Sequence, residues 1–148
     1  MLRFAHLIEP PFCFRTPQGR VTGCDVELAR LLAQRLDLGP FEPIETTFAE
    51  LLPGLAEDRW DMTTGLFVTA ERQRVALFSR PIWSLPDGLL VRRTDASGIT
   101  GYRSLAARGL KLAVIAAQVQ QDTARRLGVP SSTIRTFSNY EEAAAAVL

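Results

Sequence analysis

Segments with strand character alternate with segments with helix character along this chain, and that alternation limits the folds open to it. The clearest helix pattern lies between Asp25 and Leu36, where apolar residues recur at helical spacing: Val26, Leu28, Ala29, Leu32, Ala33 and Leu36. We expect Asp25 to cap the start of this helix and Gly39-Pro40 to end it. Repeated strand, helix, strand units predict an α/β fold with mainly parallel sheets flanked by helices.

The N-terminal part, residues 1–93, is predicted to contain most of this alternation. Strands are predicted at 3–8, 41–47 and 60–66, with a hairpin whose arms are 12–14 and 20–23. Short helices are predicted at 49–57, with an interruption near Pro53, and at 73–77, followed by an extended apolar segment around 88–91. In a sheet of this kind, ligands bind at the carboxyl ends of the strands.

A polar stretch of small residues, 94–98, is the predicted boundary to a second part, residues 94–148. Helices are predicted there at 102–108 and 118–127, and strands at 111–115 and 133–137. Ser138 and Glu141 have the spacing of a capping box that would open a final helix.

Composition excludes several classes of function. With 47% hydrophobic and 22% charged residues, the chain can bury a core. Its 17 Lys and Arg nearly balance its 16 Asp and Glu and are scattered, which argues against a nucleic-acid partner. No apolar run approaches the ~20 residues that span a bilayer. The first residues also lack the apolar segment and cleavage site of a signal peptide.

The two cysteines and the single histidine offer little chemistry. Cys13 and Cys24 flank a turn-rich segment, so they are either two small buried residues or the ends of a disulfide across the hairpin. His6 stands alone, without the Cys/His cluster that transition-metal sites need. The sequence therefore predicts neither a metal nor a cofactor, and no catalytic nucleophile.

The stretch from Thr63 to Arg72 is the strongest candidate for a site. It places Gly65 at a strand end, Thr69 as a helix cap and Arg72 in the first helical turn. Backbone N–H groups and a guanidinium can converge there on one carboxylate. Arg72 also has a simpler interpretation, in which it lies in solvent or pairs with Glu71.

Several short motifs together identify a family. They are Pro10-Pro11-Phe12, Gly23-Cys24-Asp25-Val26-Glu27-Leu28-Ala29, Phe48-Ala49-Glu50-Leu51-Leu52-Pro53-Gly54-Leu55, Trp60-Asp61, Thr69-Ala70-Glu71-Arg72 and Phe78-Ser79-Arg80-Pro81. With them the sequence resembles the amino-acid-type (family 3) extracellular solute-binding proteins of bacterial ABC transporters. The resemblance implies the type 2 periplasmic-binding fold, in which two lobes close over a solute, with a hinge expected here around residues 85–93.

The resemblance also implies which residues hold the ligand. Arg72 would bind the ligand carboxylate through a two-pronged pair, and the Gly65 N–H would help hold it. Phe48 would contact the ligand side chain, although ordinary core packing explains it equally well. Thr64 would lend a hydroxyl to the site.

Some positions depart from the family pattern. Phe67 stands where members offer Ser or Thr to the carboxylate, which implies a more apolar pocket. Glu9 and His6 replace an aromatic residue and an Asp, and Glu9 is either a contact for a cationic ligand group or a solvated loop charge. In the second lobe, Ala117-Gln118-Val119 replaces the family's Gly-Ser-Thr, so either Gln118 or Gln120 would substitute as a donor to the ligand, or the backbone amides alone would bind it.

The resemblance covers 1–93 as a nearly complete first lobe and 94–148 as a partial second lobe, so the chain is expected to be truncated at its C-terminal side. An uncovered sheet edge would favour swapping or oligomerisation. The expected function is binding of an amino acid or related carboxylate for an ABC importer or a sensor, outside the cytoplasm and without catalysis. The alternative is an enzyme resembling cyclohexadienyl dehydratase, with Glu9 and His6 as its acid–base groups.

Overall fold

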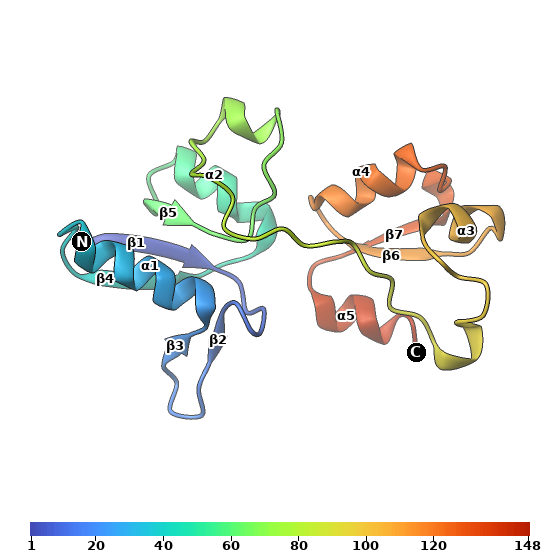
Figure 1. Ribbon diagram of the computed structural model, residues 1–148, viewed down its shortest axis with the longest axis horizontal. Coiled ribbons are helices and arrows are strands. Elements are labelled where there is room, and N and C mark those ends of the chain that lie inside the picture. The colour runs from blue at the N-terminus through green and yellow to red at the C-terminus, as the bar shows by residue number, and fades with distance from the viewer. The chain divides into compact units, whose positions relative to one another are not determined.

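A computed structural model describes all residues of the chain, 1–148, and divides them into two units, Met1–Pro81 and Ile82–Leu148 (Figure 1). Each unit has its own parallel sheet and its own buried apolar cluster. The predicted strand and helix alternation is therefore confirmed in both units.

The sheet of the first unit has three parallel strands in the order β4-β1-β5. They are β1 (Leu2–His6), β4 (Phe41–Glu45) and β5 (Met62–Thr63). All three are shorter than predicted, and the pairing of β1 with β4 runs from Leu2 opposite Phe41 to His6 opposite Glu45. Because the strands are parallel, their carboxyl ends lie at one edge of the sheet.

Helices cover both faces of this sheet. Phe4 and Ala5 are consecutive residues of β1, so their side chains point to opposite faces. Phe4 packs with Val26 and Ala29 of α1 (Cys24–Arg35), and Ala5 packs with Leu51 of α2 (Leu51–Ala56). The buried face of α1 agrees with the predicted pattern at Val26, Ala29 and Ala33, whereas Leu32 and Leu36 are exposed.

The predicted cap of α1 is wrong by two residues. Gly23 is the N-cap, with a φ of 127°, and Asp25 lies buried inside the first turn. A side chain at Gly23 would overlap the carbonyl of Phe12, and this φ is one that only glycine adopts readily. The close approach of two backbone segments therefore decides where the helix begins, which no side-chain pattern reveals.

The remaining elements of the first unit are short. The predicted hairpin is confirmed as β2 (Phe14–Arg15) and β3 (Val21–Thr22), and Figure 1 shows it projecting from the sheet. A 3-10 turn (Phe48–Glu50) leads into α2, which tolerates Pro53 in its first turn. The helix predicted at 73–77 is only a 3-10 turn, η2 (Arg72–Arg74).

The second unit is built on two parallel strands, β6 (Leu112–Ile115) and β7 (Ile134–Phe137). Its helices are α3 (Tyr102–Ala107), α4 (Val119–Arg126) and α5 (Tyr140–Ala145), with 3-10 turns at Arg93–Asp95 and Ser131–Thr133. Figure 1 shows α4 and α5 on opposite sides of the sheet. Tyr102, Leu105, Val114, Ala124 and Ile134 contribute to its buried cluster.

Two expectations for this unit need correction. The final helix is capped by Asn139, whose side chain accepts a hydrogen bond from the Glu142 N–H at 2.9 Å, one residue after the predicted Ser138 and Glu141 pair. The apolar segment 88–91 forms no strand. It lacks a neighbouring strand to pair with, and Leu89 instead packs against the buried cluster of this unit.

The boundary between the units, after Pro81, differs from the lobe boundary expected at residue 93. Side-chain contacts explain why the intervening residues belong with the second unit. Asp87 accepts hydrogen bonds from the Tyr102 hydroxyl at 3.3 Å and from the Gln120 amide at 3.2 Å. The segment expected to act as a hinge, 85–93, is thus anchored to the second unit at Asp87 and Leu89.

Candidate functional site

The carboxyl edge of the first sheet gathers most of the residues singled out from the sequence. β1, β4 and β5 end at His6, Glu45 and Thr63. The segments that leave these ends carry Glu9, Phe48, and the pair Thr64 and Gly65, respectively. Parallel topology therefore places the predicted site residues of the first unit at the edge where α/β folds bind ligands.

Arg72 is the centre of a cluster at this edge. Its guanidinium Nη1 donates to the carbonyl oxygen of Phe67 at 3.0 Å, and its carbon lies 5.3 Å from the centre of the Phe48 ring. Its backbone N–H donates to Thr69 Oγ1 at 3.2 Å, so Thr69 holds the turn on which Arg72 sits. The sequence had predicted Thr69 as the cap, but the N-cap residue of the turn is Glu71.

Burial makes Arg72 an uncommon cation. The residue is only 8% exposed, and this burial lowers its pKa, an effect that the nearby Glu71 carboxylate partly opposes. A guanidinium stays protonated at neutral pH even so. A charge withdrawn from water interacts strongly with an anion placed against it, because little solvent remains to screen the pair. The arrangement can therefore hold a carboxylate more tightly than a surface arginine could.

Of the two roles predicted for Phe48, core packing is the one that its contacts show. It packs against the buried cluster of Ala5, Leu51 and Trp60, which is the core-packing role. Its ring also lies under the Arg72 guanidinium, in a cation–π contact. Its contact with a ligand side chain stays a prediction.

Gly65 and Thr64 lie in the loop between β5 and η2. Gly65 has a φ of 78°, and an added Cβ would meet no neighbour within 4 Å, so its backbone conformation rather than space calls for glycine. The carbonyl of Thr64 accepts from Thr63 Oγ1 at 3.2 Å, and the same hydroxyl contacts the Ala5 carbonyl at 3.0 Å. Thr63, which the sequence did not single out, thus ties the start of the loop to β1.

Phe67 contributes to the cluster through its backbone. Its carbonyl oxygen accepts a hydrogen bond from the Arg72 guanidinium, and the residue as a whole is 39% exposed. The ring is therefore not used to fill the core of the first unit.

Glu9 lies in the turn after β1. Its N–H donates to the Cys13 carbonyl at 2.7 Å, and its own carbonyl accepts from the Phe12 and Cys13 N–H groups. These bonds fix the backbone of the turn and leave open whether the carboxylate meets a ligand or solvent.

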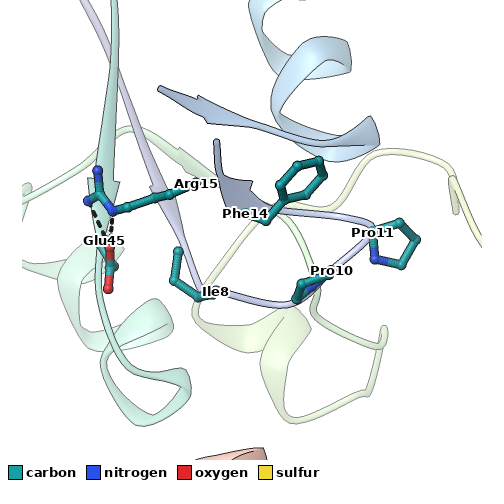
Figure 2. Close-up of a pocket in the computed structure, with 6 residues that line it drawn as sticks. All are labelled: Ile8, Pro10, Pro11, Phe14, Arg15 and Glu45. Atoms are coloured by element: carbon teal, nitrogen blue, oxygen red, sulfur yellow. Dashed lines mark hydrogen bonds and ion pairs between the residues drawn. The ribbon is translucent and has the colours of Figure 1, made fainter. Parts of the chain in front are cut away.

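A pocket of about 580 Å³ adjoins this turn, but it does not include Arg72 or Phe48 (Figure 2). It is lined by Ile8, Pro10, Pro11, Phe14, Arg15 and Glu45. Figure 2 shows Arg15 directed at Glu45, and its Nε and Nη2 donate to Glu45 Oε2 at 3.0 and 2.7 Å. Since these two charges satisfy each other, the pocket offers an apolar wall and little to orient a ligand.

His6 lies inside the first unit, 2% exposed, with its ring stacked on Phe4. Its Nδ1 is 3.2 Å from the Leu7 carbonyl, and its Nε2 has no hydrogen-bond partner. Burial lowers the pKa of the imidazole, and the Leu7 carbonyl and Glu45 oppose this effect while Arg15 reinforces it. Because stacking on Phe4 turns the ring toward the α1 face, His6 is a core side chain here.

Gln118 belongs to the second unit, where it is the N-cap residue of α4. Its side-chain Nε2 donates to the hydroxyl of Tyr140 at 2.7 Å. Ala117, just before it, adopts a φ of 63°. Tyr140 was missed by sequence reasoning, because its position one residue after the cap of α5 carries no signal that it meets Gln118.

The other reactive side chains form no cluster. Both cysteines are free thiols: Cys13 is buried, as the simpler interpretation predicted, whereas Cys24 is exposed. Burial raises the pKa of Cys13 to about 12, so its thiol is not a nucleophile at neutral pH. No group of three His, Cys, Asp or Glu side chains is arranged to hold a metal ion. None of the helices combines the length and apolar character that crossing a membrane requires.

Comparison with known proteins yields one family. The sequence model for bacterial extracellular solute-binding proteins, family 3, matches residues 2–144. A probable amino-acid ABC transporter periplasmic-binding protein of Sinorhizobium fredii is 32% identical over 142 residues, which are 94% of this chain and 47% of that protein. Cyclohexadienyl dehydratase of Pseudomonas aeruginosa is 38% identical over 72 residues, 48% of this chain and 26% of the enzyme.

Solved structures agree on the fold. An ancestral amino acid-binding protein, described as a precursor of cyclohexadienyl dehydratase, superposes with a TM-score of 0.88 at 30% identity. The match covers 99% of this chain and 65% of that structure, while the chain spans about half the length (47%) of its S. fredii relative. The expected type 2 periplasmic-binding fold is confirmed as far as the chain extends.

The comparisons lend no support to the swapped or oligomeric assembly expected from the sequence. They do account for the motifs that run from Pro10 to Pro81, and the family match extends well past them into the second unit. Because the family model matches residues 2–144, the chain belongs to the bacterial extracellular solute-binding proteins of family 3.

Proposed function

We propose that this chain binds an amino acid or a related small carboxylate, with Arg72 as the anchor for the carboxylate. The observation that carries the proposal is the burial of the Arg72 guanidinium at the carboxyl edge of a parallel sheet, oriented by the Phe67 carbonyl and the Phe48 ring. A guanidinium that is held in one orientation and largely withdrawn from water attracts a carboxylate placed against it more strongly than a surface arginine does.

Other residues would complete the site. The Gly65 N–H and the Thr64 hydroxyl, in the loop that precedes Arg72, would share the carboxylate. Gln118, in the second unit, stays a ligand residue predicted from the sequence alone, and its amide donates to the Tyr140 hydroxyl. Glu9, in the turn after β1, would meet a cationic group of the ligand.

The biological setting of the proposal follows from the relatives. The S. fredii relative is a periplasmic-binding protein of an amino-acid ABC transporter. By analogy, this chain would act outside the cytoplasmic membrane and deliver its solute to the membrane subunits of an ABC importer, or report it as a sensor. Binding itself would involve no bond making, and its selectivity would come from differential affinity.

Calorimetric titration of the 148-residue chain with L-amino acids, and with the corresponding amides as controls, tests the proposal. We expect binding of at least one free carboxylate and no binding of its amide, because an amide cannot form the charged pair with Arg72. Failure of every carboxylate to bind, with a protein that melts cooperatively, would reject the proposed function.

A dehydratase activity is the second candidate, because a 72-residue part of the chain matches cyclohexadienyl dehydratase. The structure favours binding over this enzyme, since His6 is 2% exposed and stacked in the core, where a substrate does not reach it. Incubation with prephenate decides between the two. An aromatic product that appears with the native chain and is lost in Glu9→Gln would establish the enzyme.

A further inference from the structure

The loop that leads into Arg72 presents large apolar side chains to solvent. Phe67 is 39% exposed and its neighbour Val68 is 43% exposed. A single exposed apolar residue needs no explanation. Val68 follows Phe67 directly, so the loop beside the buried cation carries two apolar side chains that the core leaves uncovered.

The backbone and the side chain of Phe67 have separate roles. Its carbonyl, 3.0 Å from Arg72 Nη1, is what positions the guanidinium. Any residue supplies that carbonyl, so the contact with Arg72 does not explain the phenyl ring. The ring belongs to the residue that contacts Arg72, but it is the carbonyl and not the ring that holds the guanidinium.

Phe48 adds a second aromatic surface to the same cation. Its ring faces the Arg72 guanidinium and is partly buried against the cluster of Ala5, Leu51 and Trp60. Two residues that contact the Arg72 guanidinium are thus phenylalanines: Phe48 uses its ring, whereas Phe67 uses its carbonyl and stays partly exposed.

We infer that the carboxylate bound at Arg72 carries an apolar, preferably aromatic, body, and that Phe67 is the residue that selects it. This inference rests on the proposed function, since it assigns a ligand class to the same site. Phe67 supplies no hydrogen-bond donor or acceptor through its side chain. A hydroxyl or amide on the ligand that was placed against this ring would lose its bonds to water without replacement. A phenyl group would instead bury apolar surface and gain an aromatic contact.

The test compares two probes that share a carboxylate and differ in a ring. Calorimetric titration of the 148-residue chain with 3-phenylpropanoate and with propanoate measures the preference, and L-phenylalanine with L-serine repeats the comparison in amino acids. We expect the aromatic probe of each pair to bind roughly tenfold or more tightly, the range that one apolar contact discriminates.

Variants of the loop assign the preference to Phe67. Phe67→Ser should remove most of the preference while keeping the Arg72 contact, because the carbonyl remains. Val75→Ser is the matched control, since Val75 is also exposed, at 61%, but lies beyond Arg72. The Val75→Ser variant should bind both probes with the affinities of the native chain. If Phe67→Ser does not fold, Phe67→Leu keeps an apolar side chain and should lose only the aromatic part of the preference.

The outcomes separate the two proposals. If no carboxylate binds, the proposed function fails. If carboxylates bind but 3-phenylpropanoate and propanoate do so equally, or if folded Phe67 variants keep the full preference, this inference is overturned and the proposed function stands.

Discussion

The guanidinium of Arg72 lies over the ring of Phe48, with 5.3 Å between its carbon and the ring centre. Phe48 follows β4 and Arg72 follows β5, so two segments that leave the same sheet edge meet in this contact. The pair joins the core of the first unit, where Phe48 is packed, to the group proposed to bind the ligand.

Replacing Arg72 is the most direct test of the anchor. We expect Arg72→Ala to weaken binding of any carboxylate by at least about thirtyfold, since loss of one partner of a desolvated charge pair costs roughly 2 kcal/mol or more. Arg72→Lys should restore only part of the affinity, because an ammonium cannot form the two-pronged pair. Calorimetry measures both.

Arg74→Ala is the matched control for these variants. Arg74 belongs to the same 3-10 turn but is exposed, so it should not affect affinity. Equal affinity in Arg72→Ala and the native chain would remove Arg72 from the site.

The Phe48 ring should matter for affinity beyond its packing. Phe48→Leu keeps an apolar side chain in the core, so we expect a loss of less than about 1.5 kcal/mol in the free energy of unfolding. Carboxylate binding should weaken roughly three- to tenfold, because the cation–π contact that orients Arg72 is gone. Chemical denaturation and calorimetry measure the two quantities on one sample.

Phe41 offers a control with the same chemistry at another place. The guanidinium carbon of Arg30 lies over its ring, 4.7 Å from the ring centre. This contact is at the start of β4, whereas Phe48 follows the end of β4. Phe41→Leu should therefore lower stability without changing affinity. If Phe41→Leu and Phe48→Leu weaken binding alike, the effect comes from general loosening of the sheet and not from orientation of Arg72.

Gly54 should be intolerant of any side chain. It lies in α2 against Trp60, and an added Cβ would overlap the indole ring. The indole cannot move away freely, because its Nε1 donates to the Leu51 carbonyl at 2.9 Å. We expect Gly54→Ala to lower the free energy of unfolding by about 1–3 kcal/mol, as for other overpacked cores.

Gly88→Ala is the comparison for that variant, since an added Cβ there meets nothing within 4 Å. It should leave the denaturation midpoint almost unchanged. A midpoint for Gly54→Ala that matches the native chain would mean that α2 and Trp60 separate easily.

Much of the fold was predictable from the sequence, because helices and strands leave local, periodic patterns of apolar residues. The spacing of Val26, Ala29 and Ala33 identified α1, and short apolar runs identified every strand that the structure contains. The errors arose where distant backbone segments meet. The start of α1 depends on the approach of Gly23 to Phe12, and the segment 88–91 stays unpaired because no strand lies beside it.

The candidate site was predictable in part. The spacing from Thr69 to Arg72 indicated a turn that carries a cation and is held by Thr69, and the Thr69 hydroxyl does accept from the Arg72 N–H, although the N-cap residue is Glu71. The contact of Arg72 with Phe48 spans 24 positions and has no signal in a single sequence. The same holds for Gln118 with Tyr140 and for Asp87 with Gln120, which depend on tertiary packing.

His6 should give the stability of the chain a pH dependence near neutrality. It is the only histidine, and burial lowers its pKa below the value of the unfolded chain, with the Leu7 carbonyl and Glu45 opposing and Arg15 adding to the shift. Between the folded and unfolded pKa values, the unfolded chain binds more protons. Stability therefore rises with pH across that window. The stability that neutral His6 contributes is lost as the pH falls from above its unfolded pKa of about 6.5 toward its lower, folded pKa.

Denaturant unfolding at a series of pH values from 8 down to about 5 measures this dependence, since carboxylates ordinarily titrate lower, near 4. We expect the native chain to lose stability over that range, and His6→Phe to lose less, because a phenyl ring stacks on Phe4 without a proton to bind. The unpartnered Nε2 is removed by the same change, which offsets part of the cost of altering a core residue. Identical pH profiles for the two proteins would show that His6 is hydrated in the folded chain and titrates as it does when unfolded.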